Sequence, residues 1–98
     1  MIELRKTPEF ARWIDDLRDL RARARIQVRI QRLMDGNPGD VKPVAEGVSE
    51  LRIDYGPGYR VYYTQRRGVF VILLCGGDKR TQEADIARAL RLARELES

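Results

Sequence analysis

The chain has 98 residues, of which 43% are hydrophobic and 35% charged, so we expect one domain, residues 1–98, with its own core. One cysteine, Cys75, excludes an internal disulfide, and the absence of histidine excludes a Ser-His-Asp triad and a histidine-ligated zinc site. The net charge of +4 suits a polyanionic partner and equally an ordinary soluble surface. No apolar run approaches the roughly 20 residues of a membrane span, and no signal peptide is evident. We therefore expect a cytoplasmic protein with no membrane contact, no metal and no cofactor.

The N-terminal third predicts a short strand followed by two helices. Residues 1–6 alternate apolar and charged side chains, which is typical of a strand. Thr7 and Pro8 then form a helix start, as N-cap and first helical residue. A second helix is predicted from about Asp19 to Asp35, and it ends at the breaker residues 36–40.

The second predicted helix carries arginines at positions 21, 25, 29 and 32, away from its apolar stripe. Arginine supplies 16 of the 19 cations in the chain, and its planar guanidinium matches phosphate oxygens. A GC-rich genome also produces an arginine-rich chain. The helix is therefore read either as a solvated face with intrahelical ion pairs or as a surface for a partner or a nucleic acid.

From Val41 onward the apolar pattern has a period of two, which predicts strands. Val41–Val44 is expected at a sheet edge because Pro43 cannot donate a backbone hydrogen bond. Strands are then predicted at residues 50–55, 59–65 and 69–75, joined by short turns into an antiparallel meander, with Gly76-Gly77 ending the last one. A final helix is predicted from about Thr81 to Leu96. The expected fold is α+β, in the order β-α-α-β-β-β-β-α, with two N-terminal helices packed on an antiparallel sheet and a C-terminal helix.

The pleat of two neighbouring strands predicts which side chains share a face. If Leu51, Ile53, Val61 and Tyr63 point toward the helices, the residues between them point away from those helices. These outward residues are Arg52, Asp54, Arg60 and Tyr62, and the basic pair Lys79-Arg80 follows the next strand. The interpretation that requires no function is a set of cross-strand charge pairs on a solvated face, such as Arg52 with Asp54. Cys75 and Trp13 are expected to be core residues.

The alternative interpretation of the outward cluster is a phosphodiester site. Arginines bind non-bridging oxygens and stabilise the extra charge of the transition state. An RNA 2′-hydroxyl supplies its own nucleophile, with Lys79 as the candidate base. Tyr62 is the candidate for stacking on a nucleobase or assisting proton transfer.

Two runs of the chain resemble the bacterial RelE/ParE toxin superfamily, and more closely its HigB-like "addiction module killer protein" branch. They are Leu51–Tyr63, read LRIDYGPGYRVYY, and Leu73–Gln82, read LLCGGDKRTQ. The resemblance implies a toxin of a type II toxin–antitoxin pair. Many RelE-like members cut mRNA in the ribosomal A site, and ParE-like members act on DNA gyrase. Arg52 and Arg60 match the strand arginines that contact mRNA phosphates, and Lys79 with Arg80 matches the basic position after the last strand.

The resemblance also implies partners: a helix-turn-helix antitoxin, the ribosome with its mRNA, and operator DNA bound through the antitoxin. The chain departs from the RelE pattern because no tyrosine follows Lys79. The leading hypothesis is a metal-independent, ribosome-dependent mRNA endonuclease that uses Arg52, Arg60, Tyr62 and Lys79. A gyrase inhibitor without nuclease activity and a non-toxic interaction module are the alternatives.

Overall fold

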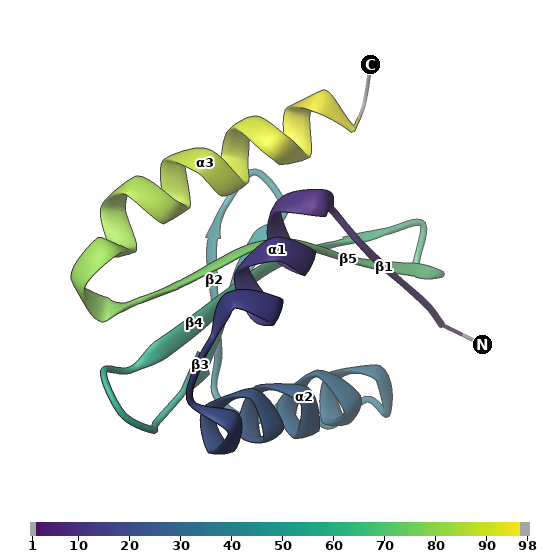
Figure 1. Ribbon diagram of the computed structural model, residues 1–98. Coiled ribbons are helices and arrows are strands. Elements are labelled where there is room, and N and C mark those ends of the chain that lie inside the picture. Colours follow the sequence, from purple (N-terminus) through teal and green to yellow (C-terminus); the bar gives the residue numbers. More distant parts are fainter. Residues whose placement is uncertain (1, 97–98) are drawn as a thin grey trace.

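The computed structural model describes residues 2–96, which fold into a five-stranded sheet with helices on both faces. The elements follow the predicted order (Figure 1) and include one 3₁₀ turn, η1, before the last helix. They are β1 (Glu3–Lys6), α1 (Pro8–Asp16), α2 (Leu20–Met34), β2 (Val41–Ala45), β3 (Val48–Ile53), β4 (Tyr59–Arg66), β5 (Phe70–Asp78), η1 (Lys79–Thr81) and α3 (Gln82–Glu95).

The strands lie in the order β1-β5-β4-β3-β2, and β2 to β5 form the predicted antiparallel meander. The remaining strand, β1, lies at one edge and runs parallel to β5. The backbone N–H of Glu3 donates to Val69 and that of Thr7 donates to Leu73, so the bonds advance in the same direction along both chains. The α+β class is confirmed, with β2 and its Pro43 at the opposite edge.

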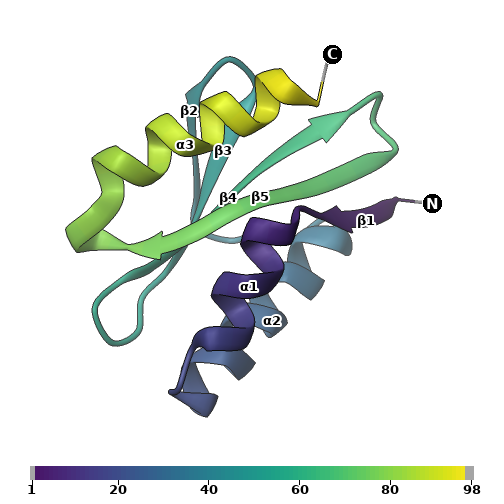
Figure 2. The same ribbon diagram turned by 45° about the horizontal axis from the view of Figure 1, so that its top comes forward.

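One face of the sheet packs against α1 and α2 through an almost entirely apolar core (Figure 2). As predicted, Leu51, Ile53, Val61 and Tyr63 all point into this core. Helix α1 contributes Phe10 and Ile14, and α2 contributes Ile26, Ile30 and Leu33. Helix α1 is capped by the Thr7 hydroxyl, as its sequence predicts, and α2 is capped by the Asp19 carboxylate.

The other face is covered by α3 alone, which crosses the sheet on the side away from α1 and α2 (Figure 2). Its core contains Tyr62, Leu74 and Cys75 from the sheet and Ala89 and Ala93 from the helix. Small alanines let the helix backbone lie close to the strands. Three polar side chains are also buried on this side of the sheet: Glu50, Thr64 and Asp85.

The prediction that Gly76-Gly77 ends the last strand is wrong, because β5 continues through both glycines to Asp78. A Cβ on Gly76 would overlap the ring of Trp13, and one on Gly77 would overlap the carboxylate of Asp85. Gly76 lies against Trp13 of α1 and Gly77 lies against Asp85 of α3, on opposite faces of the sheet. Any residue with a Cβ would clash at either position. Trp13 is thus the predicted anchor between α1 and the sheet.

Candidate functional site

Arg52 of β3 and Arg60 of β4 lie directly opposite each other on the face away from α1 and α2. Like charges directly across two strands repel and destabilise the pair. Each guanidinium therefore needs an acidic neighbour, or a bound anion between the two. The structure supplies a different carboxylate for each arginine.

Arg52 pairs with Asp40, which ends the loop after α2. The Arg52 Nη2 atom lies 3.0 Å from Asp40 Oδ1, and Nε donates to the same oxygen over 3.1 Å. This hydrogen bond raises the pKa of Arg52 above its ordinary value. The predicted pairing of Arg52 with Asp54 is wrong, because the loop brings a more distant carboxylate into reach. With 38% of its side chain exposed, Arg52 remains accessible to a bound molecule.

Arg60 is held more tightly, with only 13% of its side chain exposed. Its Nη1 atom donates to the carbonyl oxygens of Gly58 and Tyr59, over 3.3 and 3.4 Å. Its Nε atom lies 3.8 Å from Glu50 Oε1, close enough for an ion pair but too far for a hydrogen bond. The expected open strand face is therefore wrong for Arg60, whose guanidinium is packed in place.

Glu50 is almost completely buried, and its Oε2 atom accepts two hydrogen bonds. Tyr62 Oη donates over 3.2 Å and Gln82 Nε2 donates over 2.7 Å. A buried carboxylate is costly unless it is hydrogen-bonded or paired with a cation, and here it is both. The network links β3, β4 and α3 and ends at the guanidinium of Arg60.

A cavity of about 330 Å³ lies beside this network, where the loop after β3 meets the end of β5. Arg52, Arg60 and Lys79 all line it, together with Asp40, Asp54 and the turn residues Gly56, Pro57 and Gly58. Gly58 adopts φ +83°, and a Cβ there would contact both Arg60 Nη1 and the Cβ of Lys79. The tight turn therefore lets Lys79 lie beside Arg60. Within residues 2–96 the Lys79 amine has no hydrogen-bond or ion-pair partner.

Tyr62 lies on the predicted face but does not reach the cavity, because α3 covers it completely. Burial, followed by the charge of Glu50, raises the pKa of Tyr62 and keeps its hydroxyl protonated. In this position the ring has no surface on which a nucleobase can stack. What the tyrosine does here is hold Glu50.

Arg80 also lies outside the cavity. Its side chain is 79% exposed and forks onto Asp78, with Nη2 2.9 Å from Oδ2 and Nε 3.3 Å from Oδ1. The same hydrogen bonds lower the pKa of Asp78. The structure thus brings together three of the five predicted site residues: Arg52, Arg60 and Lys79.

Cys75 is buried as predicted, and burial raises the pKa of its thiol to about 12. A thiol that stays protonated is a poor nucleophile. It is a core residue beneath α3.

Sequence reasoning missed three residues here: Asp40 and Glu50, which pair with the two arginines, and Gln82, which holds Glu50. Glu50 stands two residues before Arg52 on the same strand, so the alternation places it on the same face. Its role depends on the cover provided by α3, which the pattern of one strand does not reveal. Asp40 and Gln82 lie outside the strands and carry no sequence signal for this contact.

The described chain is thus an α+β protein whose sheet, turn and β5 end form a small cavity with two arginines and a lysine. Residues 12–96 match the family described as "Phage derived protein Gp49-like (DUF891)". The chain is also 55% identical over 95 residues to an uncharacterised protein of Haemophilus influenzae, covering 97% of this chain and 96% of that protein. The chain therefore belongs to the Gp49-like family of phage-derived proteins.

The Gp49-like family is associated with the toxins of toxin–antitoxin systems and is related to RelE and HigB. The resemblance seen in the sequence is confirmed at this level, and it points to an antitoxin as partner. Among residues 2–96, no helix combines the length and the apolar character required to cross a bilayer.

Proposed function

We propose that this protein is a cytoplasmic toxin that cleaves mRNA on the ribosome without a metal ion and is neutralised by a helix-turn-helix antitoxin. The observation that carries the proposal is the convergence of Arg52, Arg60 and Lys79 on one small cavity. Three cationic side chains around a hollow of this size suit the charge of a phosphodiester. Membership of a toxin-associated family supports the same reading.

In the proposed reaction the 2′-hydroxyl oxygen of the RNA attacks the adjacent phosphorus. The O2′–P bond forms, the P–O5′ bond breaks, and the products are a 2′,3′-cyclic phosphate and a 5′-hydroxyl. Arg52 and Arg60 donate to the non-bridging oxygens, which carry more charge in the transition state than in the substrate. Removing one such donor from an enzyme costs about 10²–10³-fold in rate.

Besides Asp40, which is paired with Arg52, two groups at the cavity are able to move protons: the amine of Lys79 and the carboxylate of Asp54. One accepts the proton of the 2′-hydroxyl, and the departing 5′ oxygen takes a proton from the other or from water. Arg80 is outside the cavity and serves as an auxiliary RNA contact. Glu50, fixed by Tyr62 and Gln82, positions Arg60.

The proposal is tested by cell-free translation of a reporter mRNA with purified protein, mapping new 5′ ends by primer extension. New ends should appear only when ribosomes are present, and Arg60→Ala should remove them while circular dichroism shows an intact fold. Arg91→Ala is the matched control, because it removes the same charge from an exposed site on α3. Intact mRNA together with inhibited gyrase supercoiling would replace the proposal with the gyrase-inhibitor alternative, and no effect in either assay would favour an interaction module.

A further inference from the structure

A second and larger hollow, of about 660 Å³, runs along α2 beside the end of β3. Its walls carry Arg21, Arg25, Arg29 and Arg32, and its only acidic lining residue is Asp54. Asp54 also lines the smaller cavity, so the two hollows meet at this residue. The α2 groove, as we call the larger hollow, therefore continues the candidate site along the surface.

The arginines of the α2 groove differ in what they already bind. Arg29 is used structurally, since it donates to the backbone carbonyl oxygens of Arg52, Pro38 and Asp40, over 2.6, 2.9 and 3.2 Å. Arg21, Arg25 and Arg32 make no ion pair within residues 2–96. Arg52, Arg80, Arg88 and Arg94 each have a carboxylate partner, whereas Arg12 and Arg91, elsewhere on the surface, share with the groove arginines the lack of one in the described chain.

The positive charges of the groove are also crowded together. A Cβ on Gly39 would contact Nη2 of both Arg29 and Arg32, so these two guanidinium groups converge above that glycine. Burial and the charge of Arg32 lower the pKa of Arg29. An anion bound in the groove would relieve this repulsion.

The groove also has the spacing and surfaces that suit a polynucleotide. Arg21 and Arg25 are one helical turn apart, a rise of about 6 Å, which is comparable to the step between phosphates in an extended strand. The Arg25 guanidinium lies 4.6 Å above the ring of Tyr55, forming a flat, cationic surface of the kind on which bases stack. Val28, 59% exposed, adds an apolar wall.

We propose that the α2 groove binds the RNA strand beyond the phosphate held in the smaller cavity, with Arg21 and Arg25 contacting successive phosphates and Arg32 a further one. This inference rests on the proposed function and extends it from a single phosphate to the path of the strand. Continuity with that cavity favours RNA over an acidic protein segment as the occupant. It also assigns a role to the arginine-rich helix α2. From the sequence alone, its arginines form either a solvated face or a surface for a partner or a nucleic acid.

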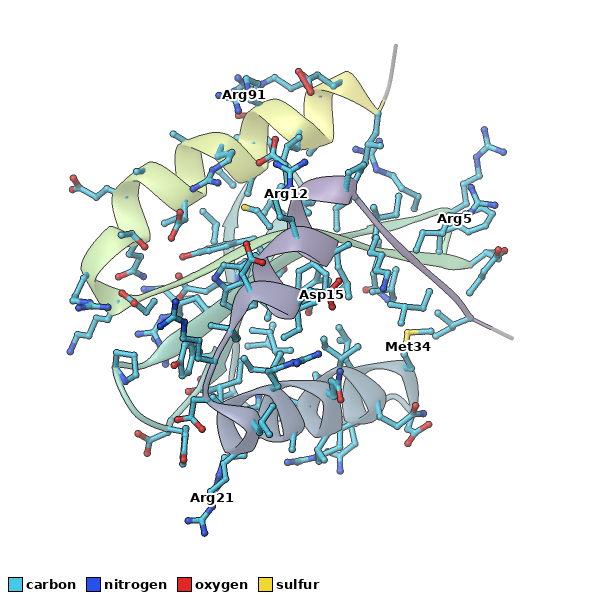
Figure 3. The ribbon with its side chains drawn as sticks, viewed as in Figure 1. Arg5, Arg12, Asp15, Arg21, Met34 and Arg91 are labelled. Carbon is cyan, nitrogen blue, oxygen red and sulfur yellow. The ribbon has the colours of Figure 1, made fainter. Side chains whose placement is uncertain are left out.

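The test is fluorescence anisotropy with a labelled, 2′-O-methylated RNA of about 12 nucleotides, which binds but has no free 2′-hydroxyl for cleavage. The groove variant is Arg21→Gln with Arg25→Gln. The matched control is Arg12→Gln with Arg91→Gln, two exposed arginines without an ion pair in the described chain. Figure 3 shows Arg21 projecting from α2 at the bottom of the view, away from Arg12 on α1 and Arg91 on α3, so the control removes equal charge away from Arg21.

The groove variant should bind the RNA about tenfold or more weakly, and its slope of log affinity against log salt should fall by about 1.4, or 0.7 per phosphate contact. The control should change neither the slope nor the affinity by more than about twofold. Equal loss in both variants, or no loss in the groove variant, would overturn the inference. So would a polyglutamate peptide that binds the groove more tightly than the RNA.

Two further outcomes separate this inference from the proposed function. If the groove variant loses RNA binding and the native protein never cleaves mRNA, the RNA-binding role of the α2 groove stands and the proposed nuclease activity is rejected. Ribosome-dependent cleavage abolished by Arg60→Ala, with RNA binding by the groove variant unchanged, would keep the nuclease and reject the groove.

Discussion

The two faces of the sheet are buried in different ways. The face toward α1 and α2 is filled almost entirely by aliphatic and aromatic side chains, whereas the face toward α3 also buries Glu50 and Asp85. Burying apolar side chains stabilises the fold whatever their orientation. Burying a carboxylate destabilises the fold unless its hydrogen-bond partners are correctly placed. The first face thus holds the protein together, and the second fixes the orientation of Arg60 at some cost in stability.

The largest expected effect is on the α1/α2 face. Leu51→Ala should lower the free energy of unfolding by about 2–5 kcal/mol, because Leu51 is fully buried and its loss leaves a cavity. Urea denaturation measures this, with the exposed Val28→Ala as control. A loss below about 1 kcal/mol would mean that the apolar face is not the main source of stability.

The next effect tests the polar face. Glu50→Ala should cost about 1–3 kcal/mol, because it leaves the buried groups of Tyr62 and Gln82 without their acceptor. Glu50→Gln keeps an acceptor oxygen but removes the charge near Arg60, so it should recover much of the stability while mRNA cleavage stays reduced. Equal recovery of stability and cleavage in Glu50→Gln would show that Glu50 has only a structural role.

The buried thiol beneath α3 makes the stability of the protein depend on alkaline pH. Burial raises the pKa of the Cys75 thiol on the α3 face from 9.0 to about 12. Between these values the unfolded chain has lost the proton that the folded chain retains, so the free energy of unfolding should fall as the pH rises from about 9 to about 12. Denaturation midpoints measured over this range should fall less steeply for Cys75→Ala. Identical slopes would show that the thiol makes no contribution.

The smallest effect is expected at the exposed ion pair. Asp40→Asn removes the carboxylate from Arg52 but leaves its guanidinium free to bind a phosphate, so stability should hardly change and cleavage should persist. Thermal unfolding and primer extension together check this. If Asp40→Asn abolished cleavage in a folded protein, the carboxylate would have a role in the reaction itself.

The strand pattern predicted the apolar face well, because the period of two determines which residues of β3 and β4 point inward. It did not reveal which layer covers the other face. An amphipathic helix indicates that α3 packs on something, but the stripe does not say which surface it covers. For that reason Tyr62 was expected at the site and was found beneath the helix.

The prediction that Gly76-Gly77 ends the last strand is wrong for a related reason. In isolation Gly76-Gly77 is typical of a strand end, and only the approach of Trp13 and Asp85 shows why the strand needs glycine there. Arg52, Arg60 and Lys79 were predicted together because two follow from strand register and the third follows the next strand. Their partner carboxylates come from long-range contacts that local patterns do not encode.

The parallel pairing of β1 with β5 affects the order in which the protein can fold during its synthesis. Glu3 lies opposite Phe70, so the first strand made waits for the last before it has a partner in the sheet. Contacts of such sequence separation form slowly. Lys79 follows β5 directly, so the cavity gains its third cation only after β5 has been synthesised. Until β5 has been made, a growing chain therefore has neither a partner strand for β1 nor a finished cavity.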